Sequence, residues 1–305
     1  NMNTRTERLR KRLFDTDPRI CPVRWIYFTE SMKETEGKPN ALRRSQAFYD
    51  VLSRMTVYVN ADELIVGNQA QWPKASPIYP EYSTDWLEAE LNGPPFFPDK
   101  RPGDKFYYTQ EDKDKILECV DYWKGKSLYE NLRKTLPEKI NQAWDANVID
   151  DTWVSAAGLG NVIVDYKGVV DKGLSDVMRR IENKLKRLDP REPGNTRKRW
   201  FLEAALQGNQ AVVMFSGRIA DCCKEQAEQE KDETRRRELL KLEDICRNVP
   251  LNPARTFHEA VQSIYMILLA VHLESNGHAI SLGRFDQYVN PYYKRDLEEG
   301  RITRE

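Results

Sequence analysis

The sequence predicts a mainly helical α/β segment, and three observations support this prediction. Apolar residues at helical spacing recur over most of the 305-residue chain. A capping box at Thr256 and Glu259 starts a long apolar helix, whereas the runs suited to β-strands are few and short. The chain can bury a sizeable core, and a prior of roughly 150 residues per domain permits one large domain or two.

The N-terminal part of the chain predicts a layer of helices. Three helices are expected there, over residues 5–14, 23–36 and 41–54. Short apolar runs at residues 56–59 and 64–66 flank a turn-like tetrapeptide, which predicts a small hairpin. The sequence GPPFFPDKRPG at residues 93–103 holds four prolines and two glycines, so we expect a surface loop there.

The middle of the chain predicts more helices and one strand. The helices are expected over residues 110–123, 128–132, 137–144, 169–188 and 196–248. We expect the last of them to break near Gly208 or Gly217, and its alternating charges at residues 224–244 indicate a solvated face. The sequence AAGLGNVIVDY, residues 156–166, predicts a loop followed by a buried strand.

A well-buried helix is predicted directly after the capping box. Its apolar residues recur on one face, at Phe257, Val261, Ile264, Leu268 and Val271. Residues 274–293 then read ESNGHAISLGRFDQYVNPYY, and we expect a short strand between Gly277 and Gly283.

Composition excludes several classes of partner. Lysine and arginine number 48, as do aspartate and glutamate, so no net field attracts nucleic acid. The longest apolar stretch, residues 264–271, is far shorter than the roughly 18 to 20 residues of a membrane span. Five cysteines without zinc-type pairs are typical of a reducing cytoplasm. We therefore expect a cytoplasmic protein that binds neither nucleic acid nor membrane.

Both ends of the sequence suggest an excised segment. Asn1 precedes Met2, which is typical of the remnant of a cleaved tag and makes Met2 the expected natural start. Residues 296–305 are charged and helix-prone without a stop signal. We expect the chain to be the N-terminal part of a longer protein, through an artificial truncation, proteolysis or a natural split.

One of the three histidines stands out. His258 and His272 lie near the two ends of the predicted apolar helix, where structural roles are expected. His278 follows Gly277 at the edge of a loop, and polar groups beside a glycine are typical of pocket walls. A lone histidine without a nucleophile or a ligand partner is nevertheless more often structural. Spacing alone leaves both interpretations open.

Two adjacent cysteines raise the alternative of a radical relay or a strained disulfide. Cys222 and Cys223 lie in the middle of a predicted helix, in FSGRIADCCKEQAEQE. No group that would lower the pKa of either thiol can be inferred from this pattern. Packing of one thiol and exposure of the other is the favoured interpretation.

Six blocks of sequence stand out together: RTERLRKRLF, FTESMKETEG with LRRSQAF downstream, ADELIVGNQA, PIYPEYSTDWLEAEL, RPGDKF and SNGHAISLGRFDQYVNPYY. In combination they resemble the glycyl radical enzymes of the pyruvate formate-lyase-like superfamily, in its glycerol/diol dehydratase-like branch of dehydratases and lyases. Their order and spacing make the combined resemblance specific. It extends from residue 5 to residue 293, which is well under half of a typical family member.

The resemblance implies a fold and a domain assignment. The family has a ten-stranded α/β barrel of two antiparallel half-barrels, surrounded by helices. Residues 1–305 are expected to be the N-terminal part of this catalytic domain and to supply much of the helical shell and the first barrel strands. The cysteine loop and the C-terminal glycyl radical domain are expected to be absent from the chain.

The resemblance also implies a chemistry and its partners. A separate iron-sulfur activase uses S-adenosylmethionine to install a glycyl radical after translation, and no other cofactor is bound. The radical passes to a cysteine, whose thiyl abstracts a substrate hydrogen. In the dehydratase branch a nearby glutamate takes a hydroxyl proton, and the neighbouring carbon expels water, amine or sulfite. The expected partners are a small-molecule substrate, the activase and a second copy of the protein in a homodimer, in the cytoplasm or in a bacterial microcompartment.

The site residues that the resemblance implies here belong to the wall of the substrate pocket. His278 matches a histidine that hydrogen-bonds the substrate hydroxyl in diol dehydratases, and Ala279 matches an adjacent serine. Asn161 matches a second pocket histidine. The sequence contains neither a GCVE-type cysteine loop nor an RVAGY-type glycine loop. We therefore expect no catalytic residue and no metal site in this chain, which should be inactive alone.

The function predicted for the full-length protein is that of a glycyl radical lyase. It should eliminate water or another heteroatom group from a small hydroxylated substrate. A glycyl radical decarboxylase or a formate acetyltransferase is the alternative enzyme. A non-catalytic or split-chain partner, which keeps the helical shell without the radical loops, is the alternative from a different class.

Overall fold

The computed structural model describes residues 4–92, 103, 105–149 and 160–304. Helices form most of this part, as predicted. They are α1 (Thr4–Asp15), α2 (Val23–Glu34), α3 (Asn40–Arg54), α4 (Asp85–Asn92), α5 (Gln110–Trp123), α6 (Leu128–Thr135), α7 (Glu138–Asp145), α9 (Tyr166–Arg187), α10 (Asn195–Gln229), α11 (Glu233–Asn248), α12 (Phe257–Ser275) and α13 (Phe285–Glu298). The seven helices predicted before residue 190 are confirmed, with ends that differ by a few residues. The loop predicted at residues 93–103 lies almost wholly outside the described residues.

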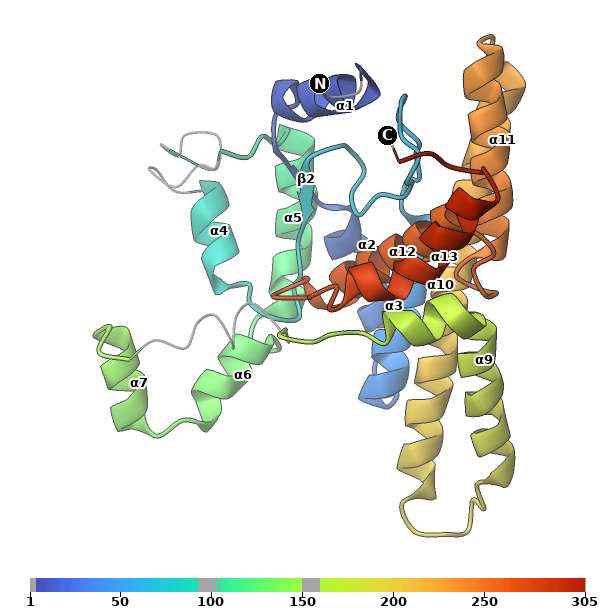
Figure 1. Ribbon diagram of the computed structural model, residues 1–305. Coiled ribbons are helices and arrows are strands. Elements are labelled where there is room, and N and C mark those ends of the chain that lie inside the picture. Colours follow the sequence, from blue (N-terminus) through green and yellow to red (C-terminus); the bar gives the residue numbers. More distant parts are fainter. Residues whose placement is uncertain (1–3, 93–102, 104, 150–159, 305) are drawn as a thin grey trace.

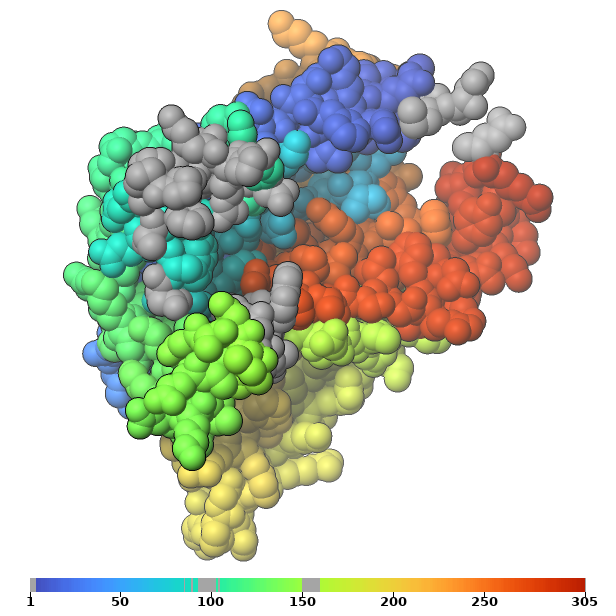
Figure 2. Space-filling view, turned by 90° about the vertical axis from the view of Figure 1, so that its left-hand side faces the viewer, coloured from blue at the N-terminus to red at the C-terminus, as the bar shows by residue number. Residues whose placement is uncertain are grey.

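The long helix α10 organises one group of helices. Helices α3, α9 and α11 pack along it, and α2 covers α3 (Figure 1). Helix α12 crosses this layer and also contacts α9, α11 and α13. Figure 2 shows helices α4 to α7, in teal and green, on the left, and the C-terminal residues, in red, mainly on the right. No helix in the described ranges is long and apolar enough to cross a membrane.

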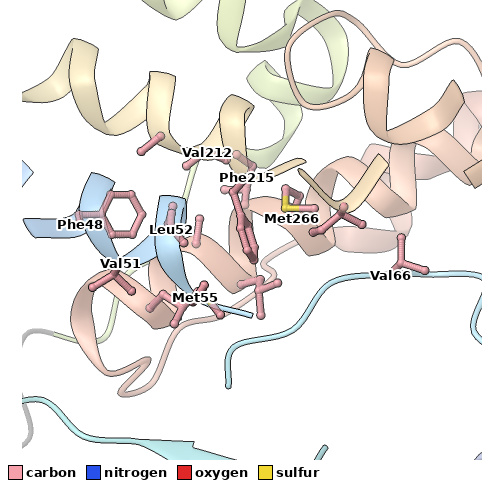
Figure 3. Close-up of a cluster of buried hydrophobic side chains, with 14 of the residues drawn as sticks. Phe48, Val51, Leu52, Met55, Val66, Val212, Phe215 and Met266 are labelled. Atoms are coloured by element: carbon pink, nitrogen blue, oxygen red, sulfur yellow. The ribbon is translucent and has the colours of Figure 1, made fainter. Parts of the chain in front are cut away.

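The hydrophobic core lies where α3, α10 and α12 meet (Figure 3). Helix α3 contributes Phe48, Val51 and Leu52, whose spacing puts them on one face of the helix. Phe215 of α10 and Met266 of α12 are fully buried against this face. Burial of such side chains stabilises the fold by about 1.5–3 kcal/mol each relative to exposure.

A two-stranded parallel sheet joins two segments that are distant in sequence. Strand β1 (Arg19–Cys21) pairs with β2 (Ala75–Pro77), with Ile20 opposite Ser76. Sequence patterns missed both strands because each has three residues and β2 ends at a proline, which argues against a strand. The sheet brings residues 75–82 back against the start of α2, next to Arg24.

The hairpin predicted at residues 56–66 is wrong. The backbone of Val66 pairs with the side-chain amide of Gln262, through bonds of 2.9 Å from Val66 N and 2.8 Å to Val66 O. The side-chain amide of Asn68 similarly donates to the carbonyl of Thr56 at 2.7 Å. Side-chain amides therefore occupy backbone groups that a hairpin ladder would need, which the alternation of apolar residues could not indicate.

The break predicted within residues 196–248 exists, but not at a glycine. Gly208 and Gly217 are both helical, and a Cβ atom added at either would meet nothing within 4 Å. The chain leaves the helix after Gln229 and restarts with Asp232 as the N-cap, whose carboxylate accepts from Thr234 N at 2.9 Å. The predicted solvated face is confirmed, because every charged residue from 224 to 244 is exposed or half-buried.

The buried helix predicted after Thr256 is confirmed as α12, but its details differ. Thr256 caps the helix by accepting from Glu259 N, whereas the buried Glu259 carboxylate accepts from Arg255 N at 2.5 Å and from its guanidinium. The capping box is therefore half formed, because Arg255 draws the carboxylate away. In the predicted apolar stripe Ile264 is buried and the other members are half-buried. Residues such as Gln262 on other faces are more deeply buried, because α12 has neighbours on several sides.

Two phenylalanines of α10 offer a matched test of the core. Phe215 is fully buried and Phe201 is 66% exposed. We expect Phe215→Ala to lower the free energy of unfolding by about 3–5 kcal/mol, because it leaves a cavity between α3 and α12. Phe201→Ala should change it by less than about 0.5 kcal/mol. Chemical denaturation of the two variants measures both values, and equal losses would contradict this packing.

Candidate functional site

The loop after α12 carries two of the predicted site residues in an unusual backbone conformation. Asn276 ends the helix with φ 64° and ψ 0°, and Gly277 follows with φ 64°. Ala279 also lies in the left-handed region, at φ 50°. Three such residues within four positions turn the chain sharply, and alanine in this region is strained by about 1 kcal/mol or more. His278 is therefore held in a tight turn rather than in the predicted strand.

The third predicted residue, Asn161, lies against the same turn. Its backbone N–H donates to the carbonyl of His278 at 3.3 Å, and Ser281 N donates to the carbonyl of Val162 at 3.2 Å. Residues Ile163 and Ser281 form an isolated parallel bridge. The structure thus brings Asn161, His278 and Ala279 together from two segments more than one hundred residues apart in sequence.

A glycine makes this approach possible. A Cβ atom added to Gly160 would lie 2.0 Å from the carbonyl oxygen of His278, far inside the contact distance. Only glycine allows the two segments to lie so close. His278 is half-buried, while Asn161 and Ala279 are exposed in the structure.

The buried strand predicted after this glycine is wrong for the residues that the structure describes. Residues 160–165 form only the bridge to Ser281, and the side chains of Val162 and Ile163 are 45% and 62% exposed. The positions of residues 156–159 lie outside the described part. One backbone bridge of this kind gives the segment a neighbour on a single side, so the side chains of Val162 and Ile163 are not covered.

The end of α12, from which the turn departs, is held by arginine side chains from two other helices. The last carbonyls of a helix have no partner within it. Arg24 of α2 donates from Nε to the carbonyl of Leu273 at 2.7 Å. Arg44 of α3 donates from Nη2 to the carbonyl of Glu274 at 2.7 Å. Positive charge also complements the partial negative charge at this end of a helix.

Arg24 is buried, with 2% of its side chain exposed, and its charge is balanced by one carboxylate. Glu81 accepts from Nη2 and Nη1 of Arg24 at 2.6 and 3.1 Å, which is the bidentate geometry of a strong pair. The Tyr79 ring lies below the guanidinium, 3.9 Å from its carbon. Burial raises the pKa of the Tyr79 hydroxyl, so it stays protonated and donates to the carbonyl of His272 at 2.7 Å.

The other two histidines have the structural surroundings that their positions predicted. Burial lowers the pKa of His272, whose ring would collide with a side chain at Gly277. His258 has Nε2 2.5 Å from the carbonyl of Leu64, and burial lowers its pKa as well. The lowered pKa favours the neutral form of both imidazoles. The His258 ring packs beside the Leu64 carbonyl, and the His272 ring packs beside Gly277.

The two adjacent cysteines pack within the helical shell. Cys222 and Cys223 lie inside α10, as predicted. Burial raises the pKa of both thiols, that of Cys223 to about 12. A protonated thiol is a poor nucleophile and a poor metal ligand. Within the described ranges, no three histidine, cysteine or acidic side chains are grouped so that they could hold a metal ion.

Among the cavities near the end of α12, two reach residues 274 and 276, which lead into the turn, and sequence patterns predicted neither. The larger, of about 560 Å³, lies among α3, α9, α10 and α12 and reaches Glu274. The smaller, of about 280 Å³, lies beside β2 and α4 and reaches Asn276. Asn161, His278 and Ala279 line neither of them. The predicted site residues thus form an open face beside these hollows.

The described residues form a mainly helical segment with a polar turn at the end of α12. The family model described as pyruvate formate lyase-like matches residues 2–305. An isethionate sulfite-lyase of Nitratidesulfovibrio vulgaris is 36% identical over 299 residues, which cover 95% of this chain and 36% of the relative. The chain belongs to the pyruvate formate lyase-like family, in its branch of glycyl radical dehydratases and lyases.

Solved structures of this branch have the same fold. One describes 1,2-propanediol dehydration in Roseburia inulinivorans, with 36% identity, a TM-score of 0.96 and coverage of 100% of this chain and 36% of that one. Another is the glycerol-bound B12-independent glycerol dehydratase from Clostridium butyricum, with 32% identity, a TM-score of 0.94 and coverage of 99% and 38%. The predicted fold class, a partial α/β barrel of this family, is confirmed. The chain spans a little over one third of the length of these relatives.

Sequence patterns missed the residues that fix the turn. Arg24 interrupts the apolar run VRWIYF, and a charge within such a run could have indicated a buried pair. Its partner Glu81 lies in a loop without periodicity, so the pairing itself had no signal in the sequence.

Gly160 offers a steric test of the contact between the two segments. We expect Gly160→Ala to separate Asn161 from His278, because the new Cβ atom would overlap the carbonyl of His278. Gly208→Ala is the control, because its Cβ atom meets nothing within 4 Å and alanine favours a helix by about 0.5–1 kcal/mol. Hydrogen exchange of the Asn161 and Ser281 amides should accelerate only in the first variant. Unchanged protection of both amides in Gly160→Ala would contradict the contact.

Proposed function

We propose that the full-length protein that contains this chain is a glycyl radical lyase. It eliminates water or another heteroatom group from a small hydroxylated substrate, and this chain contributes His278, Asn161 and Ala279 to the wall of the substrate pocket. The observation that carries the proposal is the meeting of the two segments that hold these residues, within a chain that matches the family over residues 2–305.

The relatives favour a lyase over the other reactions considered. Isethionate, 1,2-propanediol and glycerol, which occur in the names of similar proteins, are small molecules with a hydroxyl group. Each can lose a neighbouring heteroatom group, as sulfite or as water. A decarboxylase or a formate acetyltransferase would need a carboxylate or acyl substrate. An indoleacetate decarboxylase also matches this chain, but its identity of 23% is lower than the 32–36% of these three relatives.

The chain's own contribution is binding and orientation. The imidazole of His278 can donate, accept or carry a proton near neutral pH. The amide of Asn161 donates and accepts hydrogen bonds but cannot carry a proton, and Ala279 offers no side-chain polar group. The pocket wall is therefore suited to a substrate that hydrogen-bonds one imidazole and one amide.

The radical chemistry depends on parts of the full-length protein outside this sequence. The glycyl radical, installed after translation by an iron-sulfur activase with S-adenosylmethionine, would supply, through a cysteine outside this sequence, the abstraction of a hydrogen atom from an unactivated carbon of the substrate. This chain holds the substrate for that step but contains neither radical-loop motif, so residues 1–305 alone are expected to be inactive. The proposed partners are the substrate, the activase and a second copy in a homodimer. The proposed location is the cytoplasm, with a bacterial microcompartment as the alternative.

The substitutions at two pocket positions predict the substrate preference. In the diol dehydratase pattern, Asn161 would be histidine and Ala279 would be serine. Alanine at position 279 leaves a polar group of a diol without its partner, at a cost of roughly 1–3 kcal/mol. Asparagine at position 161 cannot carry the proton that a histidine could deliver. We expect the full-length, activated enzyme to turn over glycerol and 1,2-propanediol poorly. The loss in kcat/KM should be at least about tenfold relative to the double variant Asn161→His plus Ala279→Ser.

The assay is an anaerobic measurement of both diols and isethionate after activation, with the glycyl radical signal in electron paramagnetic resonance as the activation control. A gain on the diols that is confined to the double variant would support the proposal. Efficient turnover of glycerol or propanediol by the unmutated enzyme would refute the substrate preference. A full-length protein that acquires no radical would refute the lyase and favour a non-catalytic partner.

A further inference from the structure

The last turn of α12 has an unusually complete set of side-chain partners. The carbonyls of three successive residues, His272, Leu273 and Glu274, accept hydrogen bonds from Tyr79, Arg24 and Arg44 respectively. These donors come from three separate segments: residues 75–82, α2 and α3. A helix end held from three directions cannot tilt or fray without breaking at least one buried hydrogen bond.

Arg24 uses its whole guanidinium in this arrangement. Nε bonds Leu273 O, while Nη1 bonds the carbonyl of Ile78 at 3.3 Å as well as Glu81. Nη2 bonds Glu81 and, at 3.4 Å, the carbonyl of Glu274. A lysine has one nitrogen and could satisfy only part of this planar fork. The arginine is therefore required for its geometry in addition to its charge.

Arg44 binds the same helix end from the more exposed side, with 36% of its side chain exposed. Besides the carbonyl of Glu274, it donates to the Glu274 carboxylate at 2.5 Å and to the Tyr82 hydroxyl at 2.9 Å. It also lies 3.7 Å from Glu81. The two arginines thus share Glu81 and Glu274 and act on one point of the backbone.

That point is four residues before His278. Between them, Asn276 and Gly277 both lie in the left-handed region, and Gly277 packs against the His272 ring. Because the backbone of this turn is tightly constrained, a displacement of the Glu274 carbonyl also displaces His278. The carbonyl of His278 in turn accepts from Asn161 N.

We propose that Arg24 and Arg44 are positioning residues for the pocket wall. They fix the end of α12 so that His278 meets Asn161 at the geometry that binds the substrate hydroxyl. Their effect on turnover rests on the proposed function of His278, whereas their effect on the turn does not. Arg24 contributes more than Arg44 to the positioning of the turn, because it is buried and makes five hydrogen bonds.

The test compares Arg24→Lys and Arg44→Lys in the full-length protein. Arg54→Lys is the matched control, because Arg54 lies on α3 with Arg44 but pairs with Glu30 of α2, and both side chains are more than 40% exposed. Hydrogen exchange measured by mass spectrometry should accelerate at residues 276–283 and 160–165 by about tenfold or more in Arg24→Lys, and less in Arg44→Lys. Exchange in α10 should be unchanged in both, and Arg54→Lys should match the wild type.

Turnover is the second measurement. The yield of glycyl radical should be unchanged in all three variants. The value of kcat/KM should fall most in Arg24→Lys, less in Arg44→Lys and not at all in Arg54→Lys. Unchanged exchange at residues 276–283 in both arginine variants would overturn the positioning proposal, as would an equal acceleration throughout α3, α10 and α12. If Arg24→Lys does not fold, the half-exposed Arg44→Lys decides by the same criteria. A loosened turn with unchanged kcat/KM would support positioning and refute substrate binding by His278.

Discussion

The buried pair of Arg24 and Glu81 is the interaction on which the candidate site depends. Removing two charges from water costs several kcal/mol per ion, which only close geometry and additional hydrogen bonds can offset. Here the bidentate pair, the backbone carbonyls of α12 and the Tyr79 ring provide them. The same bonds that make the pair tolerable also join α2, residues 75–82 and α12. The turn after α12 is therefore placed correctly only when the N-terminal helices have assembled correctly.

The rest of the fold supplies the frame for this junction. Helix α12 is buried against α9, α11 and α13, and its Gln262 side chain fixes the irregular segment around Val66. The short sheet of β1 and β2 returns the chain to α2, where Glu81 reaches Arg24. Rigid helices then present a strained turn at their edge, which is the usual relation between a scaffold and a binding loop.

Local patterns predicted the helices because helix periodicity and capping are local properties of a sequence. They failed at Val66 because a distant group decides there: Gln262 replaces a hairpin partner. They also misplaced the break after α10, which lies after Gln229, where Asp232 caps α11, and not at a glycine. For the site, His278 and Asn161 followed from the family resemblance, and the structure brings them together, though their roles in binding stay predictions. Arg24 could not be paired with Glu81 from sequence, since 57 residues separate them and no periodicity links them.

The central claim is that His278 and Asn161 form a wall of the substrate pocket, and a structure of the full-length protein with its substrate bound tests it most directly. The account predicts a hydrogen bond of about 2.7–3.2 Å between the imidazole of His278 and a substrate hydroxyl. It also predicts that the side-chain amide of Asn161 contacts the same molecule. A substrate bound elsewhere, with neither side chain in contact, would contradict the account.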